Sequence, residues 1–213
     1  MCSSDLYLNA LMIDNQGIQI GRYQKMKRIP FGEYVPLVSD WPLIRAWVEG
    51  FFGKFLNEMA KGSSHEFFET EKVNIVPLIC YEVMFPEFVA DAVSRSQLEN
   101  ETSGFLVGLS SNGWFGKTRQ PYQHVNASIL RAVENRMPLI HAVNNGPSIV
   151  ALPDGSVIFI SDYLREGGYI VDVPYSAKAN RSYYSQFPRL FVFSIYGILV
   201  GIMMLSIRKP ASI

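Results

Sequence analysis

The chain has 213 residues and carries 19 basic and 19 acidic side chains, so its formal net charge is zero. Binding to nucleic acid depends on neutralising phosphates, so we expect no nucleic-acid partner. Charged residues make up 18% of the chain and hydrophobic residues 48%, which indicates either a large core or a segment in lipid. The two cysteines, Cys2 and Cys80, exclude a disulfide-dense scaffold and a zinc site built from four thiolates.

Taken in chain order, the first 186 residues have the pattern of one α/β domain. Residues 8–13 and 18–23 are apolar stretches on either side of Asp-Asn-Gln-Gly, which predicts a β-hairpin. Residues 73–80 and 104–109 are short apolar runs, typical of buried strands. The remaining predicted elements are helices at 86–94 and 120–136, a hairpin with strands at 148–152 and 156–160, and a last strand at 169–173. No repeat or low-complexity linker divides them, so we predict a single domain at 1–186.

An amphipathic helix is predicted between Asp40 and Met59. Asp40 suits the N-cap and Pro42 suits the first turn. Apolar side chains recur every three or four residues, and half of them are aromatic: Leu43, Ile44, Trp47, Val48, Phe51, Phe52, Phe55 and Leu56. Such a helix either packs on the core, as most do, or lies on a bilayer as a membrane-facing arm. The apolar C-terminal segment favours the arm, which we place at 40–59.

The C-terminal segment is predicted to cross a membrane. Residues 190–207 contain no charged side chain, and as a helix they would extend about 27 Å, close to the ~30 Å hydrocarbon core of a bilayer. Arg189 precedes them, and Arg208 and Lys209 follow. The alternative, a buried core helix, is disfavoured because no face carries a polar stripe. We therefore predict a transmembrane helix at 187–209 and a tail at 210–213. The flanking charges do not set the orientation of the helix.

Cys80 is the candidate nucleophile. It ends the predicted strand at 73–80, and a thiol attacks well near neutral pH once a cation or a base lowers its pKa. The commoner explanation of a lone cysteine is a small buried core residue. Lys25 directly follows a predicted strand and suits the role of the cation, with Lys27 as a competitor. Glu33 is a lone carboxylate in an otherwise apolar segment.

The three histidines do not extend this site. His65 lies in a polar stretch and is interpreted as a solvated loop residue, and nothing marks His124 or His141 as a base for the cysteine. No pair of histidine and cysteine has the spacing of zinc ligands. We therefore expect no metal and no cofactor.

Three long motifs carry a family resemblance. They are KMKRIPFGEYVPL at 25–37, LICYEVMFPE at 78–87, and the stretch from SNGWFG to LPDGSV at 111–157. In this order they resemble the nitrilase-type domain of the apolipoprotein N-acyltransferases, within the carbon–nitrogen hydrolase superfamily. The resemblance covers residues 8–173. It implies a partial nitrilase-like α-β-β-α sandwich followed by one C-terminal transmembrane helix.

The resemblance also implies an activity. The family transfers an acyl chain from a phospholipid, through a thioester on a cysteine, to the N-terminal diacylglyceryl-cysteine of a lipoprotein. Matched residue by residue, Cys80 is the nucleophile, Lys25 stabilises the thiolate and the oxyanion, and Glu33 is a second essential carboxylate. Tyr81 and Glu82 match functional residues beside the nucleophile. The arm that faces substrate and membrane would include Trp41, Trp47, Phe51, Phe52 and Phe55.

The implied partners are the phospholipid donor, the lipoprotein acceptor and the bacterial inner membrane. The catalytic domain would lie on the outer, periplasmic side of that membrane, and the full-length protein would be a monomer. The alternative function is a membrane-anchored amidase or nitrilase that hydrolyses a small C–N bond with the same cysteine, lysine and glutamate. A third interpretation is an anchored interaction domain without activity.

The chain departs from the family pattern at three places. Asn112 stands where the family has an aspartate before Trp-Phe-Gly, and we expect it only to adjust hydrogen bonding. The general-base glutamate and the preceding membrane helices have no match before Lys25, so we expect an N-terminally truncated chain with little or no activity. Residues 2–6, Cys-Ser-Ser-Asp-Leu, are what a common sequencing-adapter end encodes. We hypothesise that residues 1–6 are not native, with an ordinary start codon as the alternative.

Overall fold

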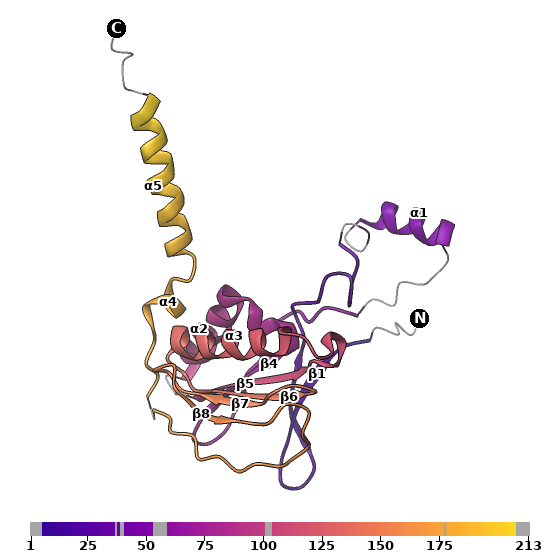
Figure 1. Cartoon of the computed structure of the whole chain (residues 1–213), viewed down its shortest axis with the longest axis vertical. Coiled ribbons are helices and arrows are strands. Elements are labelled where there is room, and N and C mark those ends of the chain that lie inside the picture. Colours follow the sequence, from indigo (N-terminus) through magenta and orange to yellow (C-terminus); the bar gives the residue numbers. More distant parts are fainter. Residues whose placement is uncertain are drawn as a thin grey trace.

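A mixed six-stranded sheet forms the centre of the molecule (Figure 1). The computed structural model describes residues 6–36, 38, 41–52, 59–100, 104–176 and 178–207. The strand order is β3 (Phe68–Glu69), β4 (Asn74–Ile79), β5 (Gly104–Ser111), β6 (Leu139–Asn144), β7 (Ile149–Ala151) and β8 (Val157–Ile160). Strands β4, β5 and β6 are parallel, and the outer three pair antiparallel. The parallel centre brings the carboxyl ends of β4, β5 and β6 to one edge of the sheet.

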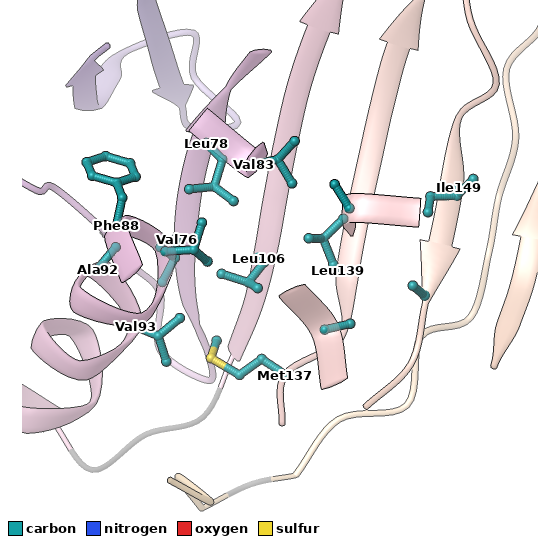
Figure 2. Close-up of a cluster of buried hydrophobic side chains, with 14 of the residues drawn as sticks. Val76, Leu78, Val83, Phe88, Ala92, Val93, Leu106, Met137, Leu139 and Ile149 are labelled. Carbon is teal, nitrogen blue, oxygen red and sulfur yellow. The ribbon is translucent and has the colours of Figure 1, made fainter. Parts of the chain in front are cut away.

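Two helices cover one face of this sheet. They are α2 (Pro86–Asn100), which connects β4 to β5, and α3 (Gln120–Asn135), which connects β5 to β6. Figure 2 shows the core between the layers, where Val76, Leu78, Leu106 and Leu139 from the strands meet Val93 from α2. Because a strand alternates its side chains between two faces, every second residue of β4 enters this core.

A separate hairpin packs on the opposite face of the sheet. It consists of β1 (Asn9–Ile13) and β2 (Gln19–Gln24), and its Ala10 and Tyr23 form a second apolar cluster with Phe68 and Ile79. Gly21 lets the hairpin approach, since a Cβ at this position would lie 2.6 Å from the Phe68 ring. The hairpin therefore delivers the end of β2, and Lys25 after it, to the side of β4.

Helices α1 (Pro42–Phe52) and α5 (Leu190–Ile207) project from this layered body, and a third, short helix, α4 (Tyr183–Gln186), packs against α2 and α3. Helix α1 stands away from the sheet at the end of a long excursion (Figure 1). Trp41 and Trp47 are 60% and 64% exposed. The short α4 leads into α5, which projects from the domain with most of its side chains exposed (Figure 1). Among the described residues, no helix is long and apolar enough to cross a membrane. The predicted transmembrane helix at 187–209 extends beyond the described residues and stays a prediction.

Most predicted elements are confirmed, with differences that have physical reasons. The strand predicted at 169–173 is wrong: Tyr169 packs its ring on Phe159 at 4.8 Å between centroids, and Ile170 is fully exposed. Strand β6 was not predicted. Of the helix expected at 40–59, the structure shows α1 at Pro42–Phe52, and Asp40 and residues 53–58 lie outside the described part. The α/β class is confirmed. In the described part of the chain, helices cover one face of the sheet, and the second β layer consists of the β1–β2 hairpin.

A buried histidine links α3 to the sheet. The two ring nitrogens of His141 lie 2.7 Å from Ser110 Oγ and 2.7 Å from Ser128 Oγ. Gly108 makes room for the ring, since a Cβ there would lie 2.7 Å from it. Burial, with a smaller contribution from His124, lowers the pKa of His141 from its ordinary value of 6.5 to about 3. The folded state thus holds His141 neutral.

This lowered pKa predicts a loss of stability in acid. The unfolded chain binds a proton at His141 below pH 6.5 and the folded chain does not, so the free energy of unfolding falls as pH drops from 6.5 toward 3. One such group contributes a slope of about 1.4 kcal/mol per pH unit. Urea unfolding at about pH 7 and about pH 5 should show a shallower pH dependence for His141→Gln than for the wild type. Equal slopes would contradict this account.

Candidate active site

Cys80 occupies a strained turn at the carboxyl end of β4. It is the first residue of the short helix η1 (Cys80–Met84) and has φ 53°, in the left-handed region that non-glycine residues rarely adopt. Its thiol is half-buried and interacts with the backbone N–H groups of Ser111 and Tyr81. Strain of this kind persists where the surroundings enforce it, which is common at functional sites.

Lys25 and Glu33 form a buried ion pair beside this turn. Lys25 Nζ lies 2.6 Å from Glu33 Oε1 and 2.8 Å from Oε2, and the two residues are 2% and 5% exposed. Lys25 directly follows β2, and Glu33 sits on a tight turn in which Phe31 has φ 61°. The backbone N–H of Ile29 also donates to Glu33 Oε2, at 2.9 Å. The lysine acts electrostatically on the thiol of Cys80, so the fold brings these three predicted site residues together.

Glu82 joins the segments that carry Cys80 and Lys25. Its fully buried carboxylate accepts four hydrogen bonds, from the hydroxyl of Tyr23 (2.8 Å) and from the backbone N–H groups of Met26 (2.6 Å), Lys27 (2.9 Å) and Ile79 (2.8 Å). Burial raises the pKa of Glu82, and these hydrogen bonds oppose that rise. With its oxygens so occupied, the geometry makes Glu82 a positioning residue rather than a proton carrier.

The geometry also separates the two competing lysines. The ammonium of Lys27 lies 5.6 Å from the ring centroids of both Phe85 and Phe88, on α2 and the turn before it. Lys25 is the lysine paired with Glu33 beside the thiol. The ring of Tyr81 packs edge-on against Phe85 at 5.3 Å, and Tyr81 interacts with the thiol through its backbone N–H.

The thiol of Cys80 is held mainly in its protonated form. Burial raises its pKa, and Glu33 adds to this, while Lys25 and the backbone N–H groups of Ser111 and Tyr81 lower it; the net direction is upward. The two carboxylates of the site are both engaged, Glu33 by the lysine and Glu82 by its four donors. Forming the thiolate therefore needs a further base or a raised pH.

Sequence reasoning missed two neighbours of the site. Tyr23 was not singled out, although it lies in the strand two residues before Lys25, and the period-2 alternation of an extended chain places both side chains on the same side. Ser111, at the end of β5, supplies a backbone donor, which no side-chain pattern reveals. Asn112, next along the chain, is 1% exposed, and neither of its amide side-chain atoms has a hydrogen-bond partner.

The predicted arm residues are not part of this cluster. Trp41 and Trp47 lie on the projecting α1 segment, while the side chains of Phe51 and Phe52 and all of Phe55 lie outside the described part of the chain. The described residues contain no group of three or more histidine, cysteine, aspartate or glutamate side chains that could hold a metal ion.

Comparison with known proteins identifies the family. Residues 3–180 match the model of the carbon-nitrogen hydrolase family. The chain belongs to this family. Solved structures show the same fold: a mutant of the amidase from Nesterenkonia sp. AN1 has a TM-score of 0.57 at 20% identity, covering 88% of this chain and 62% of that one. Saccharomyces cerevisiae Nit3 has a TM-score of 0.53 at 16% identity, covering 75% and 51%. The nitrilase-like α/β fold is thereby confirmed.

Curated relatives within the family confirm the predicted resemblance. The apolipoprotein N-acyltransferase of Geobacter metallireducens is 29% identical over 206 residues, which cover 96% of this chain and 37% of that protein. The apolipoprotein N-acyltransferase of Pseudomonas putida is 36% identical over 152 residues, which cover 71% and 28%. The chain thus spans less than two fifths of the length of these relatives.

The electrostatics of the thiol yield a test of the site. In a Cys2→Ala background, where Cys80 is the only cysteine, we expect alkylation by iodoacetamide to rise with pH to a midpoint above the ~8.5 of an ordinary thiol. Lys25→Met should raise this midpoint, because it removes the cation, and Glu33→Gln should lower it. Lys27→Met is the matched control and should leave it unchanged. The account fails if the midpoints of Lys25→Met and Lys27→Met move alike.

The role of Glu82 gives a separate prediction. Glu82→Gln keeps one oxygen but turns an amide N–H toward backbone donors, so at least one buried donor loses its partner. The free energy of unfolding should fall by about 1–3 kcal/mol or more. Glu71→Gln, on an exposed turn, is the control and should change it little. Urea denaturation followed by circular dichroism measures both. If Glu82→Gln is as stable as the wild type, Glu82 is not a positioning residue.

Proposed function

We propose that this chain carries the nucleophile of a lipoprotein N-acyltransferase. The reaction moves an acyl chain from a phospholipid, through a thioester on Cys80, to the α-amino group of a diacylglyceryl-cysteine at a lipoprotein's N-terminus. The observation that carries the proposal is the strained, half-buried cysteine beside a buried Lys25–Glu33 pair. Its support for this activity over others comes from the names of the relatives, at 29% and 36% identity.

In the first half-reaction the thiolate of Cys80 attacks the ester carbonyl of the phospholipid. A C–S bond forms, the ester C–O bond breaks, and the lysophospholipid leaves with a proton on its released oxygen. The ammonium of Lys25 and the backbone N–H groups beside the sulfur suit the stabilisation of the negative charge in the tetrahedral intermediate. The thiol proton must first be removed, and burial makes this the difficult step.

In the second half-reaction the amine of the acceptor attacks the thioester. A C–N bond forms, the C–S bond breaks and releases the thiolate of Cys80, and the attacking amine passes one proton to a general base such as a carboxylate. Both carboxylates of the site are engaged in hydrogen bonds. We therefore propose that this chain, taken alone, acylates slowly and does not pass the acyl group on.

We further propose that α1 and α5 bring the domain to its lipid substrate. Helix α5 contains no charged residue, its described side chains are largely exposed, and it projects away from the sheet (Figure 1). Helix α1 presents exposed Leu43 and Trp47 at the end of its own excursion, and exposed Trp41 directly precedes it. In this arrangement α5 inserts into the bacterial inner membrane, α1 lies on the membrane surface, and the catalytic domain sits as a monomer on the outer side.

Acylation of Cys80 tests the proposal. The chain, incubated with phospholipid vesicles at alkaline pH to populate the thiolate, should gain the mass of one acyl chain on the peptide that contains Cys80. The adduct should be lost with hydroxylamine, as thioesters are, and be absent from Cys80→Ala. Added diacylglyceryl-lipopeptide should not be converted to the N-acylated product. Intact-protein and peptide mass spectrometry provide both measurements.

An assay of ammonia release from small amides, run in parallel, addresses the alternative hydrolase. A membrane-anchored amidase would release ammonia from small amides through Cys80 and would gain no acyl chain from vesicles. That result would replace acyl transfer by C–N hydrolysis as the function. If neither an adduct nor ammonia forms at alkaline pH, the proposal that Cys80 is the nucleophile of this chain is overturned.

A further inference from the structure

A groove separates α2 from the base of α5. It has a volume of about 750 Å³ and is lined by α2 and by the segment that enters α5: Asp91, Ser94, Arg95, Phe187, Pro188, Arg189, Leu190 and Phe193. Its size lies within the range of sites that hold a small organic ligand. It lies outside the cluster around Cys80, and no step of the proposed reaction uses it.

The charges of the groove are arranged for a zwitterion. Asp91 and Arg95 are four residues apart on α2, so they share one face of that helix. In the described part of the chain neither has an ion-pair or hydrogen-bond partner. Arg189, at the entry to α5, forms an exposed ion pair of 3.6 Å with Glu87 of α2. The groove thus offers the guanidinium of Arg95, the guanidinium of Arg189 with its partner Glu87, and the carboxylate of Asp91, which also acts electrostatically on His65.

The apolar side of the groove continues into α5. Phe187, Leu190 and Phe193 are 52%, 42% and 65% exposed. They belong to the segment between α4 and α5 and to the first turn of α5, the helix that leaves the domain in Figure 1. From Leu190 onward the exposed surface of the helix is apolar. A ligand seated here would therefore have its polar end between the arginines and its apolar end along α5.

We propose that this groove binds one phospholipid with an amine-bearing headgroup. Arg95 and Arg189 donate to its phosphate, for which the planar guanidinium is well suited. Asp91 accepts from its ammonium group. The acyl chains extend along Phe193 and the rest of α5. The bound lipid fixes α5 to α2 at the membrane surface, as a structural lipid distinct from the acyl donor. This inference rests on the proposed insertion of α5 into a bilayer.

Lipid retention tests the groove directly. The full chain is reconstituted into vesicles of phosphatidylethanolamine and phosphatidylglycerol, extracted in mild detergent, and examined by native mass spectrometry for lipid bound per chain. We expect one retained phosphatidylethanolamine. Arg95→Gln and Arg189→Gln should each lower retention about tenfold, because each removes a charge-assisted hydrogen bond. Asp91→Asn should abolish the preference for phosphatidylethanolamine while leaving phosphatidylglycerol bound.

The matched control is Arg165→Gln, an exposed arginine that pairs with Asp162 three residues away, as surface arginines commonly do. It should retain lipid like the wild type. If Arg95→Gln and Arg189→Gln both retain lipid like the wild type while the chain sediments with vesicles, lipid binding in the groove is refuted. If inorganic phosphate stabilises the lipid-free chain through Arg95 and no lipid is retained, the site is an anion site and the proposal is wrong. A chain that fails to sediment with any vesicle refutes the insertion of α5 instead.

Discussion

The Glu82 carboxylate is the interaction on which the arrangement of the site depends. Three segments meet at it: the end of β2 through Tyr23, the turn after it through Met26 and Lys27, and the end of β4 through Ile79. The donors of Tyr23 and Ile79 are buried and those of Met26 and Lys27 are partly buried, and a buried donor left without a partner costs about 1–3 kcal/mol. The hairpin and the large sheet share only a small apolar cluster, so this polar junction sets the position of Lys25 relative to Cys80.

The buried ion pair then constrains the chemistry. A lone ammonium would be costly to bury, and Glu33 balances the charge of Lys25 where water cannot. The same carboxylate opposes the thiolate, because it raises the pKa of Cys80 while the lysine lowers it. The pair is thus suited to stabilise a negative charge that appears during the reaction and disappears again. It is poorly suited to create a resting thiolate. The ion pair can therefore stabilise the oxyanion, but another group must remove the proton of the thiol.

The fold was predictable where burial alone decides the structure. The β1–β2 hairpin and the apolar runs of β4 and β5 follow from side-chain period and length. Strand β6 could not be found this way, because its His141 sits in the core only through two serine partners from β5 and α3. Residues 169–173 have the composition of a strand, but they pack on the sheet through Tyr169 without a strand partner. Both differences arise from tertiary contacts that a local pattern does not contain.

In the site as well, the sequence pattern indicates which residues are reactive, but tertiary contacts determine the role of Glu82. Cys80 and Glu33 stand out in the sequence because each is reactive or charged in an apolar context, and Lys25 because it directly follows a predicted strand. The joining role of Glu82, in contrast, depends on Tyr23, 59 residues away. This cluster suits C–N hydrolysis as well as acyl transfer, since both pass through an acyl-enzyme and an oxyanion. Besides the names of the relatives, what favours a lipid donor in the proposed function lies on the exposed apolar surfaces of α1 and α5. In the proposed enzyme, therefore, substrate choice resides in projecting segments and acyl chemistry in the joint at Glu82.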